Sequence, residues 1–311
     1  METATSLPQW ALALLTWVMD WSWGALGLVV GLVAVFGAAV LLGQVALRAL
    51  GNVSGRRRPS GPPPAQWANI VRKNFTASRG LSNEDFASLL GLIQIFVADK
   101  HFEGAQGFQI DDEVRVTIAA QACYLILALD VPVYPRTRTV LVYPSTFVPI
   151  RLDDAGQAIE EDPSLGEAWD EGTVILAWDS SLQGGIDPSD GSNLVFHEFA
   201  HQLDGASGEM SGNPAGLPMS ALKPWARVLA ESHEQLKQAA ERGLDVVLDH
   251  YGASDEVEFF AVATEAFFER PRDLRGVFPD LYQQLVAFYG RDPAESDGVL
   301  RRHPDTSDRR E

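Results

Sequence analysis

The sequence has few basic residues and almost no cysteine. Among 311 residues, 24 Lys and Arg stand against 42 Asp and Glu, a formal net charge of −18. A surface of that charge repels phosphate backbones, so nucleic acid is not expected as a partner. The single cysteine, Cys123, excludes an intrachain disulfide and a cysteine-rich zinc site. It lies in an apolar run, where cysteine is usually a small core residue.

The N-terminal region lacks basic residues. No Lys or Arg precedes Arg48, and residues 23–47 include no charged side chain. Such a stretch is long enough to cross a bilayer as a helix. We therefore expect residues 1–48 to form a membrane anchor with one transmembrane helix at about 23–47. A secretory signal peptide fits less well, because it needs a basic start and a shorter apolar core. We interpret the short apolar stretch 7–19 as an interfacial helix, with a second span as the alternative.

Basic residues follow the predicted span and none precede it. Arg48, three arginines at 56–58, Arg72 and Lys73 all lie on its C-terminal side. The positive-inside rule then predicts a single-pass protein of the inner (cytoplasmic) membrane, with the N-terminus outside and the large domain in the cytoplasm. Residues 49–66, rich in Arg, Pro and Gly, are typical of a linker.

Helix and strand patterns mix beyond the linker. Ser82 precedes an amphipathic pattern that predicts a capped helix to about Ala98, and residues 112–128 predict a second, largely buried helix. Residues 139–143 and 173–178 are β-branched and aromatic runs, which favour strands. We expect one domain over residues 67–290, α+β in class and dominated by helices with a small sheet. Residues 291–311 are polar and predict a flexible tail.

The stretch from Asn193 to Asp204 includes His197-Glu-Phe-Ala-His201, an H-E-x-x-H pattern. On a helix these two histidines, four apart, lie on one face and can direct both imidazoles at one point. Two imidazoles suit zinc, and an open zinc site needs a third protein ligand and a water. Glu198, beside the first histidine, is placed to take a proton from that water. Ser192 and Asn193 are typical helix-start residues.

A third ligand must come from further along the chain. The residue three after His201 is Asp204 rather than Gly, and no His stands six after His201. Glu258 and Glu265 are seven apart on one face of an otherwise apolar helix, capped by Ser254 or Asp255. The economical assignment makes Glu258 the ligand and Glu265 the acceptor for a ligating imidazole. Alternatively, Glu265 lies on an exposed face. Asp204 either orients a ligand or braces a loop.

Two resemblances extend this interpretation. Tyr251-Gly, Glu258-Phe-Phe-Ala and the H-E-x-x-H segment resemble the catalytic domain of anthrax toxin lethal factor. Over most of residues 67–290 the chain more closely resembles the Mlc titration factor A (MtfA) family of zinc peptidases. The segments that support this include residues 112–123, 142–144, 166–169, 174–179 and 258–265. The resemblance implies a zincin-type metallopeptidase domain that binds one Zn²⁺ through His197, His201 and Glu258, with Glu198 as the general base.

The same resemblance implies aminopeptidase-type activity on a peptide or protein substrate and, for some members, binding of the transcriptional repressor Mlc. The resemblance to lethal factor implies that Tyr251 assists the transition state; a Tyr merely packed before a Gly turn is the alternative. The segment Val174–Trp178 is either an edge strand that binds extended substrate or an ordinary core strand. Two other hypotheses remain: a regulator-binding protein with little or no peptidase activity, and a tethered structural domain without metal. The natural substrate, exo- or endopeptidase action and the oligomeric state do not follow from the sequence.

Overall fold

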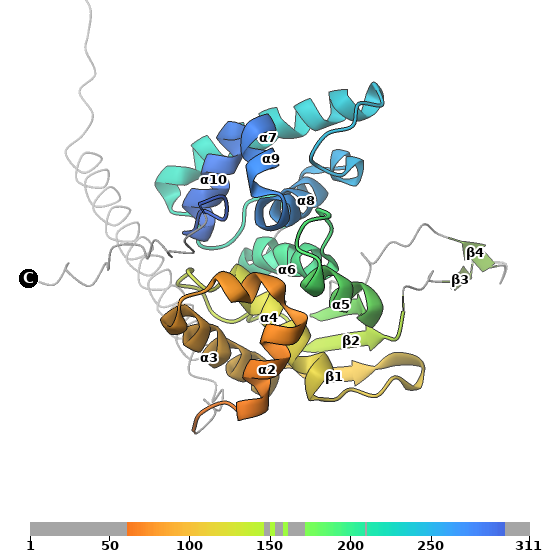
Figure 1. The fold of residues 1–311 in the computed structure, drawn as a ribbon. Coiled ribbons are helices and arrows are strands. Elements are labelled where there is room, and N and C mark those ends of the chain that lie inside the picture. The colour runs from red at the N-terminus through yellow and green to blue at the C-terminus, as the bar shows by residue number, and fades with distance from the viewer. Residues whose placement is uncertain (1–60, 146–149, 153–157, 161–171, 209, 296–311) are drawn as a thin grey trace, which may run out of the picture. The chain divides into compact units, whose positions relative to one another are not determined.

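The computed structural model describes residues 61–145, 150–152, 158–160, 172–208 and 210–295 (Figure 1). All of them belong to one unit that spans residues 57–311. The predicted interfacial helix, the predicted transmembrane helix and most of the predicted linker lie outside the described residues. Within the described ranges, no helix combines the length and the apolar character needed to cross a membrane.

Helices dominate the described chain, as predicted. The α-helices are α2 (Ala65–Asn74), α3 (Asn83–Asp99), α4 (Asp112–Leu125), α5 (Trp178–Ile186), α6 (Leu194–Asp204), α7 (Met219–Glu241), α8 (Glu256–Glu269), α9 (Pro271–Val277) and α10 (Pro279–Tyr289). Short 3-10 turns include η1 (Thr76–Gly80), η2 (Ala105–Gly107), η5 (Gly205–Ser207) and η6 (His250–Ala253). The strands are β1 (His101–Gly104), β2 (Thr139–Tyr143), β3 (Ile150–Leu152), β4 (Ala158–Glu160) and β5 (Thr173–Ala177).

Capping residues explain where the early helices begin. Ser82 accepts a hydrogen bond from the Asp85 amide at 3.1 Å, which starts α3 where the sequence predicts it. Asp111 accepts from the Val114 amide at 2.9 Å and starts α4. That helix ends at Leu125, three residues before the predicted end, but it is largely buried as expected. Within it Cys123 is fully buried, and burial raises the pKa of its thiol.

A three-stranded parallel sheet stands beside these helices in the order β1-β2-β5. The predicted strands 139–143 and 173–178 are confirmed, although β5 stops at Ala177 because Trp178 begins α5. Strand β1 is not predicted by the sequence patterns. Among the described strands β5 pairs only with β2 and is therefore an edge strand. Strands β3 and β4 form a separate antiparallel pair.

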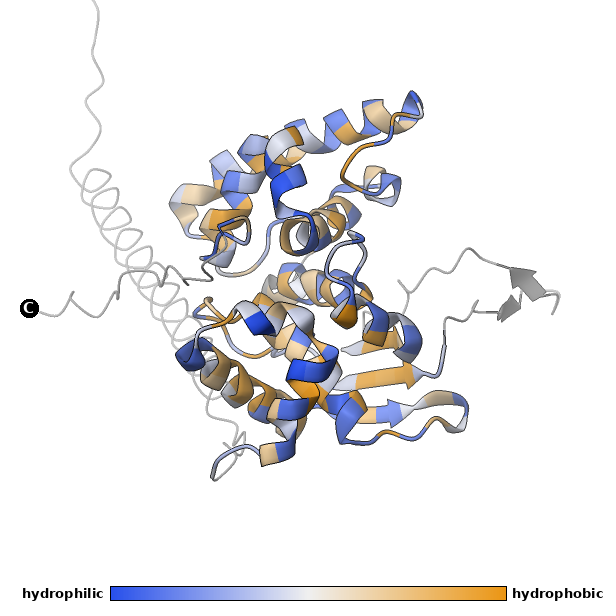
Figure 2. Ribbon diagram, in the orientation of Figure 1, coloured by the Kyte–Doolittle hydropathy of each residue, from blue (hydrophilic) through white to orange (hydrophobic). Residues whose placement is uncertain are grey.

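Helix α6 occupies the centre of the described fold. It packs on α4 and α5 and, on another side, on α8 (Figure 1). Its buried Phe199 lies against Phe96 of α3, with ring centroids 5.5 Å apart. Its buried Phe196 lies 5.4 Å from Phe268 of α8. Figure 2 shows hydrophobic residues along β2 and α3. Aromatic contacts thus fix α6, and any side chain it carries, relative to both α3 and α8.

The predicted flexible tail includes residues that are buried in the structure. Arg291 is buried, donates from Nη1 to the Tyr124 carbonyl at 3.1 Å and stacks with its guanidinium carbon 3.8 Å from the Tyr124 ring centroid. Ala294 is buried as well. The prediction is wrong for residues 291–295. A polar residue such as arginine suggests an exposed segment, yet its guanidinium can be buried when it stacks on an aromatic ring. Residues 296–311 lie outside the described chain.

Candidate metal centre

The start of α6 positions the H-E-x-x-H residues. Asn193 caps the helix, because its Oδ1 accepts from the Phe196 amide at 3.0 Å. Its Nδ2 donates to the Gly184 carbonyl at 2.9 Å, which ties the cap to α5. With the helix starting there, His197 and His201 lie one turn apart on the same face. The predicted helix is confirmed, and Asn193 rather than Ser192 is its cap.

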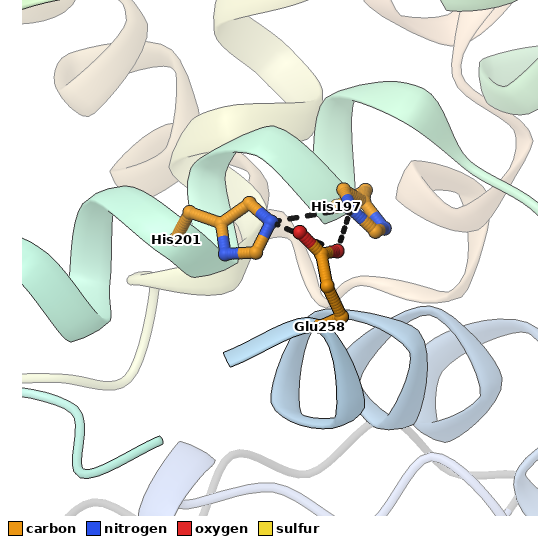
Figure 3. Close-up of side chains that lie close together, drawn as sticks. All are labelled: His197, His201 and Glu258. Atoms are coloured by element: carbon orange, nitrogen blue, oxygen red, sulfur yellow. Dashed lines mark hydrogen bonds and ion pairs between the residues drawn. The ribbon is translucent and has the colours of Figure 1, made fainter. Parts of the chain in front are cut away.

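Three side chains from two helices converge beside α6 (Figure 3). The Nε2 atoms of His197 and His201 are 3.2 Å apart, and Glu258 Oε2 lies 3.0 Å from the first and 3.4 Å from the second. Tetrahedral ligands about 2.0–2.1 Å from a zinc ion stand about 3.3–3.4 Å from one another. The donor set therefore fits such an ion in type and in spacing, and it is the one group within the described residues that could hold a metal.

Charge at this cluster reflects its close contacts. Burial would lower the pKa of His197, but hydrogen bonds to Glu258 and Glu265 outweigh it and raise that pKa to about 10. Burial would raise the pKa of Glu258, whereas its contacts with His197 and His201 lower it to about 2. An ionised carboxylate beside imidazole nitrogens is a suitable ligand set for a cation. To bind there, a metal must displace the proton from His197.

Glu265 orients the first histidine. Its Oε1 lies 2.8 Å from His197 Nδ1, and since the raised pKa of His197 keeps both ring nitrogens protonated, Nδ1–H is the donor. Its Oε2 accepts from the Asn193 amide at 2.6 Å. Glu265 is only 7% exposed, so its exposed-face interpretation is wrong. With Nδ1–H held by Glu265, displacement of the Nε2 proton by a metal would leave the Nε2 lone pair facing Glu258 and His201, the tautomer a metal requires.

Glu198 is buried next to the two histidines. It is 2% exposed, and burial raises its pKa to about 8, with the neighbouring carboxylates of Glu258 and Glu265 acting in the same direction. A carboxyl group whose pKa lies near neutral can both take and return a proton.

Tyr251 stands at the open side of the cluster. It belongs to η6, is 54% exposed and has its ring centroid 6.0 Å from that of His197. Partial burial and the negative charges of Glu258 and Glu198 raise its pKa to about 12. The phenol therefore keeps its proton at neutral pH and is a hydrogen-bond donor there.

Asp204 and Glu269 hold loops on either side of α6. Asp204 is fully buried, and its Oδ2 accepts from the amides of Ser211 at 2.7 Å and Gly212 at 2.8 Å. Of its two predicted alternatives, loop bracing is the one observed. Glu269 accepts from the Gly191 amide at 3.1 Å. The sequence patterns assign Glu269 no role, although its position one turn after Glu265 on the same apolar helix is a signal that could identify it.

Comparisons with known proteins agree with this geometry. The family model described as glucose-regulated metallo-peptidase M90 matches residues 52–290. An uncharacterized protein, slr2042, of Synechocystis sp. is 39% identical over 236 residues, which cover 75% of this chain and 86% of that protein. A Mlc titration factor A of Cronobacter sakazakii is 33% identical over 245 residues, covering 74% and 87%. One from Escherichia coli O9:H4 is 31% identical over 229 residues, covering 70% and 83%.

Proposed function

The chain belongs to the glucose-regulated metallo-peptidase M90 family, and on this premise we propose that it is a zinc-dependent peptidase that cleaves peptide bonds beside His197, His201 and Glu258. The observation that carries the proposal is the convergence of two imidazole nitrogens and one carboxylate oxygen within 3.0–3.4 Å. These three residues would hold a zinc ion, which would supply a Lewis acid to activate the scissile carbonyl and the attacking water.

The protein's own groups account for the proton transfers. Glu198 takes a proton from the attacking water and delivers it to the amine nitrogen that leaves when the C–N bond breaks. Burial raises its pKa to about 8, which suits delivery of the proton, and the charge of a bound cation would lower that pKa and favour the carboxylate that takes the proton. Tyr251 donates its phenol proton in a hydrogen bond to the oxygen that gains negative charge. Glu265 keeps His197 Nε2 directed at the site throughout.

Substrate binding is proposed at the free edge of β5. This strand pairs only with β2 among the described strands, so the backbone groups on its other side are available to an extended peptide. We expect aminopeptidase-like cleavage, as the resemblance to the MtfA family implies. The predicted anchor at residues 23–47 would hold the domain at the cytoplasmic face of the inner membrane. The similarity to lethal factor stays a prediction.

A second candidate function rests on the names of the relatives. Two of them are called Mlc titration factor A. This chain would then bind a transcriptional repressor and hold it at the membrane, with little or no peptide cleavage. A buried Glu198 with a raised pKa argues for the peptidase instead, because sequestration needs no general base.

Replacing the proposed base separates the two functions. In the purified full chain, Glu198→Gln should keep about one zinc per chain but lose peptidase activity by at least about a hundredfold, since general-base catalysis contributes that much. Glu231→Gln, at an exposed position of α7, is the matched control and should keep both properties. Stoichiometric zinc without turnover of any peptide in a broad library by the wild-type chain would favour the repressor-binding function. Absence of zinc from the wild-type chain would refute the metal site.

A further inference from the structure

The loop that follows α6 touches α8 near the ligand Glu258. Modelling a Cβ on Gly212 would place it 3.0 Å from the Glu256 carbonyl oxygen and 2.6 Å from Leu229 Cδ2 of α7. The loop backbone therefore lies directly against the first turn of α8. Gly212 also has φ of +69°, a conformation that favours glycine.

A second contact reaches α8 at Phe260, two residues after Glu258. The Gly212 carbonyl accepts from Trp225 Nε1 at 2.7 Å. The Trp225 ring, almost fully buried, lies 5.9 Å from the Phe260 ring of α8. Gly212 thus contacts α8 directly at Glu256 and, through Trp225, at Phe260. These two positions flank Glu258 in the sequence.

Asp204 fixes this loop to the metal-binding helix. It is the last residue of α6, one turn beyond His201, and its Oδ2 accepts from both Ser211 and Gly212. The Ala215 amide adds a bond to the Leu203 carbonyl at 3.0 Å. The other carboxylate oxygen, Oδ1, is buried and has no hydrogen-bond partner among the described residues. The hydrogen bonds to Asp204 and Leu203 join the loop to the end of α6.

We propose that Asp204 is a positioning residue for the metal centre, which sets the distance between α6 with its two histidines and the first turn of α8 with Glu258. Glu265 and Glu269 tie α8 to the start of α6, through Asn193 and Gly191. Asp204 and Gly212 tie the same pair of helices at the end of α6. Since Glu258 lies between Glu256 and Phe260, the second set of ties is the one that holds its carboxylate 3.0–3.4 Å from the imidazole nitrogens.

This inference rests on the proposed metal site and predicts a change in metal affinity. In the full chain, Asp204→Ala should weaken Zn²⁺ binding, measured by competition with a chromophoric chelator, about 10-fold or more, the range seen for groups that support metal ligands. It should also change the visible absorption of the Co²⁺-substituted protein. Asp204→Asn keeps one oxygen acceptor for the two amides and should restore most of the affinity.

A double substitution tests whether Asp204 acts through Glu258. If it does, Asp204→Ala should weaken binding much less in a Glu258→Gln chain than in the wild-type chain. Asp111→Ala is the control. It also removes a carboxylate that accepts from a backbone amide, that of Val114, but at the distant start of α4. It should lower stability and leave metal affinity unchanged. Gly212→Ala should force the loop away from Leu229 and the Glu256 carbonyl. It should reproduce the loss of Zn²⁺ affinity if Asp204→Ala fails to fold.

Each contrary result has a separate meaning. Wild-type Zn²⁺ affinity in folded Asp204→Ala or Gly212→Ala chains would overturn the positioning role and leave the peptidase proposal intact. An equal loss in the wild-type and Glu258→Gln chains would also overturn it, because the effect would not pass through Glu258. A wild-type chain that binds no Zn²⁺ would overturn the proposed function and this inference together.

Discussion

At the scale of single residues, the cluster depends on carboxylates that accept more than one hydrogen bond. Glu265 accepts from His197 Nδ1 and from the Asn193 amide, one on each oxygen. Asp204 accepts from two amides on a single oxygen. An amide side chain has only one oxygen acceptor, so it cannot replace Glu265, where each oxygen faces a donor, but it can replace Asp204, where both donors share one oxygen.

Glu265→Gln should weaken metal binding without unfolding the chain. Glutamine has one acceptor oxygen for two buried donors, so either His197 Nδ1 or the Asn193 amide loses its partner. We expect Zn²⁺ affinity to fall about 10- to 100-fold in a chelator competition. Glu256→Gln, on the same helix but exposed, is the control and should bind as the wild type does. Equal affinities for all three chains would contradict the orienting role of Glu265.

Tyr251→Phe should lower kcat and leave zinc affinity and KM nearly unchanged. The ring keeps its place beside His197, but the donor to the developing oxyanion is lost, and such a donor is worth about 100-fold in kcat. Steady-state kinetics on a peptide reporter measures the change. An unaltered kcat would mean that Tyr251 is only a packed residue of η6.

At the scale of elements, caps and apolar periodicity made most of the fold predictable. Ser82 and Asn193 mark helix starts that the structure confirms, because a polar cap acts within three residues. The ligand set was predictable as well, since spacings of four and seven fix a helical face. Strand β1 was not predicted, because four half-exposed residues carry too little pattern and depend on pairing with the distant β2.

Glu269, at the end of α8, should make the stability of the described fold depend on pH. Burial raises its pKa from 4.5 to about 8, and the charges of Asp190 and Glu265 add to the shift. Between those pH values the folded state holds more protons than the unfolded state, so this group lowers the free energy of unfolding as pH rises. Asn193 and the Gly191 amide, which favour the ionised form, oppose the shift only in part.

Glu269→Gln should therefore gain stability relative to the wild type as pH rises from 5 to 8. Urea unfolding of both chains at the two pH values, in the presence of a chelator, measures the difference. Chelation matters because metal binding has its own pH dependence. Parallel changes in the two chains would show that Glu269 is ionised in the folded state throughout this range.

At the scale of the whole molecule, the C-terminal end of the described chain is part of the core. Arg291 contacts Tyr124 of α4 and lies 5.5 Å from the Phe268 ring of α8. It thus joins the end of α4 to the C-terminal end of the described fold, a contact between positions 167 apart in sequence. No local pattern could predict it, because only folding brings these rings to the arginine.

Arg291→Lys should lower the free energy of unfolding by about 1–2 kcal/mol, because a desolvated arginine stacked on an aromatic ring contributes about that much and lysine lacks the planar group. Chemical denaturation measures the effect. Arg272→Lys, at an exposed position of α9, should change stability very little. A similar small effect at both positions would show that the stacking contributes nothing measurable.

Burial of Cys123 makes the native chain suitable for site-specific labelling. It is the only thiol in the sequence, is fully buried, and has a pKa raised by that burial. Thiolate is the reactive form, so a maleimide dye should react with the folded wild-type chain extremely slowly. A cysteine introduced at an exposed position, such as Met219→Cys where the side chain is 84% exposed, would then be the single attachment point for a fluorophore or spin label. Movements of α7 could be followed spectroscopically without first removing any native cysteine.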